Sequence, residues 1–365
     1  MEKIRILMVC EAFGGGVFSY VSQLCNDMCA DFEVSLAYSL RPQTPSNYTD
    51  YLDNRIKLFQ IEGFGSIGNP LQVRKTISRL RQIEATVHPD IIHLHSSIAG
   101  GIGRIAFDGN NNAVVYTPHG YSHILLGPGL KSKAYLLLEK HFGKHNAVTL
   151  TCCESEDEEA KTLCNKTAFI ETGVNIDDLA SSLNGIEPGK NERFTVYTLG
   201  RACIQKQPAL FNRIAELVPE ADFIWIGNGE LENELVSPNI TVTGWKPRKE
   251  ALSLALGADA FILCSLGEAI AMSLLENMFM EKLVLVSDVM GNKSVVKDEV
   301  NGYVCKSAED YATRIKSAMN NFPNHLARRA KEDILEIYNT KVMKCKYEAF
   351  YSNLVDAFKS EQALQ

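Results

Sequence analysis

The chain has 365 residues, a hydrophobic fraction of 45%, a charged fraction of 22% and a formal net charge of −7. This length exceeds one ordinary domain and predicts two, and the composition is typical of a soluble globular protein. The acidic balance argues against nucleic-acid binding, which normally requires an excess of lysine and arginine.

The first residues, MEKIRILMVCEAF, hold a short apolar run without a small-residue cleavage site, so we interpret them as a strand and not as a secretory signal. No apolar run approaches the ~18 residues that a membrane-spanning helix needs. The ten cysteines are scattered and form no C-x-x-C pair, which favours a reducing cytoplasm over a disulfide framework.

Strands and helices are predicted to alternate through the first half of the chain. The expected strands span residues 4–13, 32–39, 56–63, 90–97, 113–120, 147–153 and 167–174. The expected helices span residues 16–28, 70–87 and 131–142, and another begins in the acidic stretch ESEDEEAK with Ser155 as its N-cap. We interpret that stretch as a solvated helix N-terminus. The polar residues 181–194 have the composition of a linker or domain edge.

The alternation restarts after this linker. Strands are expected at residues 194–200, 223–229, 240–245, 260–265, 283–288 and 302–305, with helices at 208–218, 249–257 and 347–358. Such alternation predicts βαβ units and parallel sheets. The fold class is therefore α/β, with two consecutive doubly wound, Rossmann-like domains whose strand carboxyl ends face a shared cleft.

The most informative stretch is GEAIAMSLLENMFM at residues 267–280. It follows a run typical of a buried strand, so it predicts a short turn that holds Glu268, then a helix with Glu276 roughly two turns into it. Carboxylates at such a crevice can accept hydrogen bonds from sugar hydroxyls, and a ribose diol would satisfy Glu276 among its apolar neighbours. The alternative is a helix-start acid and an unrelated surface glutamate.

Four further features lie where expected strands end, two of them rich in glycine or in positive charge. Gly14, Gly15 and Gly16 separate the first strand from the first helix, where backbone N–H groups can approach a phosphate; a simple tight turn is the alternative. Arg201 and Lys206 follow the strand at 194–200, and two cations there suit a diphosphate leaving group, although most such residues are solvated.

His119 ends an apolar strand beside a glycine, where it can contact a ligand or merely satisfy the backbone. His93 and His95 share one face of a strand, and since no third ligand is evident we interpret them as structural and not as metal ligands. Asn228 lies in a strand-end turn between two glycines, and its function depends on proximity to the cleft.

Taken together, the chain resembles the GT-B glycosyltransferases of family 4, the retaining enzymes that use nucleotide sugars. The resemblance covers essentially the whole chain, because a series of individually weak motifs occurs in the family order. These are the glycine-rich loop, HG at 119–120, TGVN at 172–175, GR-x4-K at 200–206, IGNGE at 226–230, TGW at 243–245, E-x7-E at 268–276 and NGY at 301–303.

The resemblance implies a role for each matching residue. Gly15 and Gly16 would approach the donor diphosphate or sugar, and His119 would lie beside the donor sugar near the reacting carbon. Arg201 and Lys206 would neutralise the diphosphate in place of the metal that other glycosyltransferases use, so neither a metal nor another cofactor is expected.

The remaining implied donor contacts lie in the second half of the chain. Glu268 would bind donor-sugar hydroxyls and, with His119, Arg201 and Lys206, form the catalytic set. Glu276 would bind the ribose. The backbone around Trp245 and Lys246 would hold the base, and the turn Ala269, Ile270, Ala271 and Met272 would line the sugar and phosphate site. Asn228 is the remaining implied donor-binding residue.

The sequence departs from the family pattern in places that bear on the donor. Gln207 and Ala271 stand where the family often has glycine, the usual NGVD is Thr172-Gly173-Val174-Asn175, and EGFG is Glu268-Ala269-Ile270-Ala271. An alanine in that turn brings a side chain near the phosphate or sugar. These departures put the identity of the donor in question more than the activity.

The resemblance implies an N-terminal acceptor-binding domain at residues 1–175, a C-terminal donor-binding domain at 176–345 and a C-terminal helix at 346–365 that returns to the first domain. The implied enzyme is a hexosyltransferase-type transferase (EC 2.4), metal-independent, that moves a sugar from a nucleotide sugar, UDP preferred, to a lipid-linked glycan acceptor. Its setting would be bacterial capsule or lipopolysaccharide biosynthesis in the cytoplasm. A nucleotide-sugar epimerase of the same fold and a non-catalytic sugar-nucleotide-binding protein remain as alternatives.

Residues 129–145, GLKSKAYLLLEKHFGKH, combine an apolar centre with Lys131, Lys133, Lys140 and Lys144. Basic residues beside an apolar face favour an anionic bilayer, which would give a peripheral contact with the inner face of the cytoplasmic membrane. The alternative is an amphipathic helix packed on its own sheet with a solvated charged face.

Overall fold

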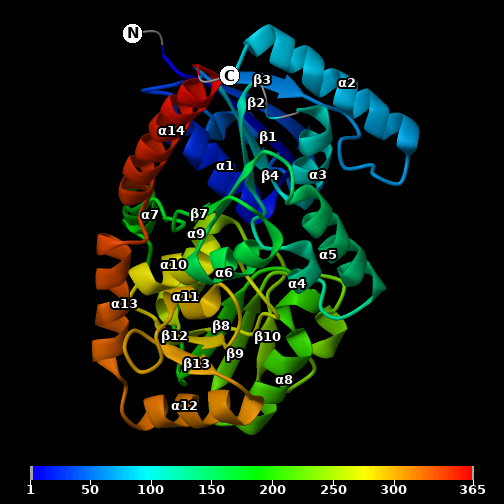
Figure 1. The fold of residues 1–365 in the computed structure, drawn as a ribbon. Helices are drawn as coiled ribbons and strands as arrows, with labels where there is room; N and C mark the ends of the chain where they lie inside the picture. Colours follow the sequence, from blue (N-terminus) through cyan, green and yellow to red (C-terminus); the bar gives the residue numbers. More distant parts are fainter. Residues whose placement is uncertain (1–2, 108, 110, 364–365) are drawn as a thin grey trace. The chain divides into compact units, whose positions relative to one another are not determined.

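The computed structural model describes residues 3–107, 109 and 111–363, which form two compact α/β units (Figure 1). Unit 1 takes the chain up to His123, the segment Pro128–Thr172 and, from Thr340 onward, the C-terminal helix. Unit 2 takes Gly173–Asn339 and the short segment Ile124–Gly127. The C-terminal helix therefore packs in the same unit as the first strand.

The described part of unit 1 holds a seven-stranded sheet in which all pairs are parallel, in the order β3-β2-β1-β4-β5-β6-β7. Its strands are β1 (Arg5–Phe13), β2 (Glu33–Leu40), β3 (Lys57–Gln60), β4 (Ile91–His95), β5 (Ala113–Thr117), β6 (Val148–Thr151) and β7 (Thr167–Phe169). β1, β4 and β5 are almost wholly buried, as expected for apolar runs covered by helices on both faces.

The helices of unit 1 are α1 (Gly15–Met28), α2 (Pro70–Val87), α3 (Ser97–Ala106), α5 (Leu130–Phe142), α6 (Glu154–Leu163) and the C-terminal α14 (Thr340–Ala363), with a 3₁₀ turn η1 (Tyr48–Tyr51). The short helix α4 (Ser122–Leu125) begins in unit 1, and its last two residues belong to unit 2. α3 was not predicted, because its sequence SIAGGIGRIA is rich in glycine. A Cβ on Gly100 would lie 2.3 Å from the Tyr116 ring, and one on Gly103 would lie 2.5 Å from Leu94. The glycines thus let α3 pack closely on the sheet.

The described part of unit 2 holds a six-stranded parallel sheet in the order β10-β9-β8-β11-β12-β13. Its strands are β8 (Thr195–Leu199), β9 (Asp222–Ile226), β10 (Ile240–Val242), β11 (Ala260–Leu263), β12 (Leu283–Ser287) and β13 (Tyr303–Cys305). Both sheets have the strand order of the doubly wound Rossmann fold, which confirms the predicted fold class.

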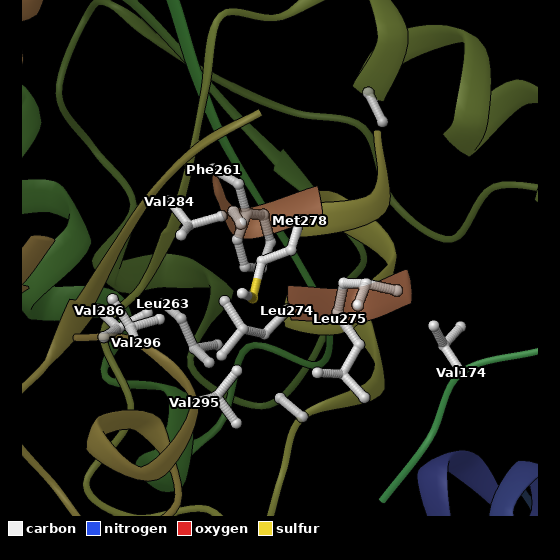
Figure 2. Close-up of a cluster of buried hydrophobic side chains, with 14 of the residues drawn as sticks. Val174, Phe261, Leu263, Leu274, Leu275, Met278, Val284, Val286, Val295 and Val296 are labelled. Carbon is white, nitrogen blue, oxygen red and sulfur yellow. The ribbon is translucent and has the colours of Figure 1, made fainter. Parts of the chain in front are cut away.

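The helices of unit 2 are α7 (Ile176–Leu183), α8 (Pro208–Leu217), α9 (Arg248–Gly257), α10 (Met272–Phe279), α11 (Asn292–Val295), α12 (Ala308–Asn320) and α13 (Asn324–Glu336), with 3₁₀ turns η2 (Ile204–Lys206) and η3 (Glu232–Glu234). Leu274, Leu275 and Met278 of α10 belong to the same buried cluster as Phe261 and Val284 of the sheet (Figure 2). Burying such a side chain contributes about 1.5–3 kcal/mol, so this contact fixes α10 on the sheet.

α10 begins at Met272, with Ala271 as its N-cap, so Glu268 lies in the turn before the helix and Glu276 lies in its second turn, as predicted. The start of α6 differs from the prediction. α6 has Cys153, not Ser155, as its N-cap, and its Glu156 is buried and not solvated. The Glu156 carboxylate accepts hydrogen bonds from the backbone N–H groups of Gly120, at 2.7 Å, and Cys152, at 2.8 Å. This acid joins two loops, a role that local composition does not show.

Candidate functional site

A largely buried ion pair marks the carboxyl edge of the unit 2 sheet. Lys206, in the turn after β8, places its Nζ 2.6 Å from Oε1 of Glu268, in the turn after β11. Ser265 Oγ donates to the same carboxylate oxygen at 2.5 Å. The side chains of Lys206 and Glu268 are only 18% and 9% exposed, so water screens this pair weakly. The pair therefore joins the two strand ends that flank the switch point of the sheet.

Hydrogen bonds and one glycine hold the Glu268 turn in place. Ser287 Oγ donates to the Ser265 carbonyl at 2.6 Å, and Asn292 Nδ2 donates to Ser287 Oγ at 3.1 Å. Gly291 has a φ of 82°, and a Cβ there would lie 2.4 Å from the Glu268 carbonyl oxygen. Only glycine fits this contact, so the carboxylate sits on a rigid support.

Arg201 follows Gly200 in the same turn as Lys206, and its side chain is exposed. Across the described chain, no carboxylate forms an ion pair with Arg201. The backbone beside it is fixed, because Ala202 N–H donates to the Asn228 carbonyl at 3.0 Å and a Cβ on Gly229 would lie 2.3 Å from the Ala202 carbonyl oxygen. Arg201 thus presents a cation from a well-supported turn, and Asn228 contributes its backbone to that support while its side chain is exposed.

Glu276 lies on α10 and forms an ion pair with Arg248 of α9, at 3.1 Å between Oε1 and NH1. Burial raises the pKa of this carboxyl, and the Arg248 guanidinium acts in the opposite direction. A carboxylate among apolar neighbours needs a partner, and here that partner is Arg248, which the sequence did not predict. A ribose diol would have to share the carboxylate with Arg248.

The other residues expected to contact the donor lie in turns of unit 2. Trp245 is 75% exposed and follows Gly244, and the Lys246 ammonium lies 3.3 Å from Glu250. Residues Ala269 to Met272 connect Glu268 to the start of α10. Among them Ala271 is buried and Ile270 is partly exposed. These residues, Arg201, Lys206, Glu268 and Glu276 all lie in one unit.

Gly15 and Gly16 belong to unit 1, at the first turn of α1. Gly14 is the N-cap residue and has no side chain that could cap the helix, and the first turn of α1 carries no acidic residue. A Cβ added at Gly15 or Gly16 would meet no atom within 4 Å among the described residues, so space lies open beside both backbones. This geometry is compatible with a phosphate or sugar approaching the helix N-terminus.

His119 is held inside unit 1 by a histidine that the sequence interpretation treated as structural. His95 Nδ1 lies 3.0 Å from His119 Nε2, and Cys152 Sγ lies 3.6 Å from His119 Nδ1. Burial lowers the pKa of His119 to about 3 and holds the pKa of His95 well below its usual value. His119 also has a φ of 55°, and Glu156 fixes the N–H of the Gly120 that follows.

The tautomers of this histidine pair follow from hydrogen-bond accounting. His95 Nε2 is buried and has no partner in the described structure. An unpaired N–H costs more than an unpaired lone pair, so His95 carries its proton on Nδ1 and donates to His119 Nε2. His119 then carries its proton on Nδ1, facing Cys152. His95 and Glu156 are site residues that the sequence did not reveal, because their partners lie 24 and 36 residues away.

The C-terminal helix contributes to the same polar cluster. His93 Nδ1 lies 2.6 Å from Tyr351 OH and its Nε2 lies 2.8 Å from Thr117 Oγ1, and Tyr20 OH lies 2.6 Å from Tyr347 OH. His93 is thus fully satisfied by protein groups. Among residues 3–107, 109 and 111–363, no cluster of three or more His, Cys, Asp or Glu side chains could hold a metal ion. No helix in the same residues is long and apolar enough to cross a membrane.

Comparisons with known proteins agree with this architecture. Residues 14–178 match the profile "Glycosyltransferase Family 4" and residues 186–336 match "Glycosyl transferases group 1". A curated relative from Escherichia coli, named UDP-Gal:alpha-D-GlcNAc-diphosphoundecaprenol alpha-1,3-galactosyltransferase, is 26% identical over 322 residues, or 79% of each chain.

Two solved structures share the fold at low sequence identity. Sucrose-phosphate synthase from Thermosynechococcus elongatus superposes with a TM-score of 0.80 at 16% identity and covers 97% of this chain and 100% of that one. HepE from Anabaena, solved in complex with UDP and glucose, has a TM-score of 0.74 at 16% identity, over 96% and 100% of the chains. Since the two profiles cover both units and both sheets have the GT-B strand order, the chain belongs to the group 1 glycosyltransferases of family 4.

Proposed function

We propose that this glycosyltransferase moves a sugar from a UDP-sugar to a lipid-linked glycan acceptor with retention of anomeric configuration, in bacterial surface polysaccharide biosynthesis. The observation that carries the proposal is the cationic edge of unit 2, where Lys206 is fixed on the buried Glu268 and Arg201 is exposed from the same turn. UDP and a lipid diphosphate acceptor are favoured because the Escherichia coli relative is named for both.

In the proposed reaction, the bond between the anomeric carbon and the diphosphate oxygen breaks, and the acceptor hydroxyl oxygen bonds to that carbon from the same face. The acceptor proton leaves with the departing phosphate oxygen. Negative charge builds on the diphosphate as the bond breaks, so fixed cations there lower the barrier. Lys206 and Arg201 would supply that charge, which a metal supplies in other enzymes.

Glu268 would serve two purposes in this scheme. Its carboxylate orients the Lys206 ammonium, and it can also accept a hydrogen bond from a donor-sugar hydroxyl, since the two hydrogen bonds it receives among the described residues, from Lys206 and Ser265, both fall on Oε1. Glu276 would bind the ribose beside Arg248, and the exposed Trp245 with Lys246 would lie at the base. Unit 1 would bind the acceptor, with His119 and the open Gly15 and Gly16 backbone beside the donor sugar.

The proposed acceptor also sets the location. An enzyme that elongates a lipid-linked glycan works at a bilayer surface, so we place the protein in the cytoplasm with a peripheral contact to the inner face of the cytoplasmic membrane. Capsule or lipopolysaccharide would be the final product.

The test is product analysis with purified protein, a panel of nucleotide sugars and a synthetic GlcNAc-diphosphate lipid acceptor. Transfer from a UDP-sugar, with an α product from an α donor by NMR, is expected. Formation of an epimeric nucleotide sugar or free UDP without a glycosylated acceptor would favour the epimerase. Binding without turnover of any donor would favour a non-catalytic protein.

A further inference from the structure

The outer face of α5 exposes leucines and lysines together. Leu130 is 87% exposed, Leu137 69% and Leu138 50%. With Ala134 and His141, which are also exposed, they recur at helical spacings of three and four residues and so share one face. This face, defined here as the leucine face, would normally be packed inward in a water-soluble protein.

Three exposed lysines of α5 border the leucine face. On a helical projection, Lys133 and Lys140 lie along one side of it and Lys131 lies along the other, while the exposed Lys144 lies in the turn after the helix ends at Phe142. An apolar stripe bordered by cations is the arrangement of helices that lie in the interface of a bilayer, with the stripe in the acyl boundary and the cations at the headgroups.

The acidic residue of α5, Glu139, does not lie on this surface. Glu139 is buried, pairs with Arg104 of α3 at 3.0 Å and accepts a hydrogen bond from Tyr116 OH at 2.7 Å. Arg104 in turn lies over the Tyr116 ring, 4.3 Å from its centroid. The inner face of α5 is therefore anchored on α3, its neighbour in Figure 1, through Glu139, and the exposed Leu130, Leu137 and Leu138 take no part in this ion pair.

From these observations we propose that the leucine face of α5 docks on an anionic lipid bilayer. The cations select the partner, because each lysine near an anionic surface gains about 1 kcal/mol. A second copy of this chain fits poorly, since a two-fold contact between two such faces would bring lysines against lysines. Glu159 of α6 interacts electrostatically with Lys140, but His123 Nε2 holds its carboxylate at 3.0 Å.

This inference names the surface that would make the membrane contact of the proposed function. It rests on the proposed function only for the biological purpose of that contact. The test reads binding and not sugar transfer, so the two can fail separately. The full chain is floated with vesicles of phosphatidylcholine alone and of phosphatidylcholine mixed with phosphatidylglycerol. Binding to the anionic vesicles only, weakened by added salt, is expected.

Two variants test the face. Leu130→Ser/Leu137→Ser/Leu138→Ser should abolish flotation, and its matched control replaces three exposed apolar residues of unit 2, Val236, Val300 and Leu335, with serine and should float normally. Lys131→Gln/Lys133→Gln/Lys140→Gln should weaken binding by about 5-fold per lysine, on the order of 100-fold in all. Its control, Arg74→Gln/Lys75→Gln/Arg79→Gln, removes equal charge from α2.

The replaced side chains are exposed, so thermal unfolding should stay close to wild type and confirm that each variant is folded. Equal flotation of the wild type and both α5 variants would overturn the proposal, as would failure of the wild type to bind anionic vesicles. A wild-type dimer in sedimentation that the leucine variant converts to monomer, with flotation unchanged, would assign the face to a second copy instead.

Discussion

Replacing Lys206 with alanine tests the charge that the proposed reaction requires. The change removes an ammonium 2.6 Å from Glu268 and leaves a carboxylate that is 9% exposed and that keeps, within the described part of the chain, the hydrogen bond from Ser265. Loss of one electrostatic donor to a transition state typically lowers turnover by ~10²–10³. Leaving a largely buried charge without its partner should also lower the free energy of unfolding by about 1–3 kcal/mol.

The double variant Lys206→Ala/Glu268→Gln separates these two effects. Neutralising the orphaned carboxylate should restore most of the stability, measured by urea denaturation, and should restore none of the turnover. Lys331→Ala is the matched control, because Lys331 pairs with Glu281 at 2.7 Å on the surface of the same unit. It should change stability by less than about 0.5 kcal/mol and leave turnover unaltered. A folded Lys206→Ala protein with near-wild-type turnover would refute the reasoning.

Three other outcomes are expected. Activity should persist in EDTA, because fixed cations replace the metal in the proposal; loss of activity that magnesium or manganese restores would contradict it. Gln207 has a φ of 51° and donates to the Cys264 carbonyl at 2.6 Å. Gln207→Ala should lose that bond and keep the strain, so it should be about 1 kcal/mol less stable than Gln207→Gly by thermal unfolding, and equal stabilities would argue against backbone strain. Burial lowers the pKa of His119 to about 3, below its unfolded value of about 6.5, so the stability that the neutral side chain contributes is complete above pH 6.5 and falls as the pH decreases. Between pH 7 and pH 5, the free energy of unfolding measured in urea should therefore fall by about 2 kcal/mol more for the wild type than for His119→Gln. Equal decreases in the two proteins would show that His119 is not buried in its neutral form.

The two sheets were predictable because their strands are short apolar runs separated by amphipathic helices. A parallel strand covered on both faces needs such a run, so β1, β4 and β11 are visible in the sequence alone. α3 was missed because glycine is a poor helix former, and its reason for being there, close approach to Tyr116 and Leu94, exists only in the folded sheet.

The candidate site was only partly predictable for a similar reason. The motifs identified Lys206 and Glu268 separately, but their contact spans 62 residues and depends on the order of β8 and β11. Likewise, the arginine that partners Glu276 lies on another helix, and His95 gains its importance from the neighbouring strand that carries His119. Pairings of this kind follow from topology, not from local pattern.

The leucine face of α5 shows a second limit of prediction from sequence. The sequence left open whether the leucines pack on the sheet or face outward, because periodicity reveals two faces and not which one is buried. The buried pair of Glu139 and Arg104 decides this, since it holds the polar side of the helix against α3.

A structure of the protein with bound UDP would test the central claim most directly. The account predicts diphosphate oxygens roughly 3 Å from Lys206 Nζ and from the Arg201 guanidinium, the distance of a charge-assisted hydrogen bond. A diphosphate bound elsewhere, with Lys206 still paired only to Glu268 and Arg201 in solvent, would contradict it.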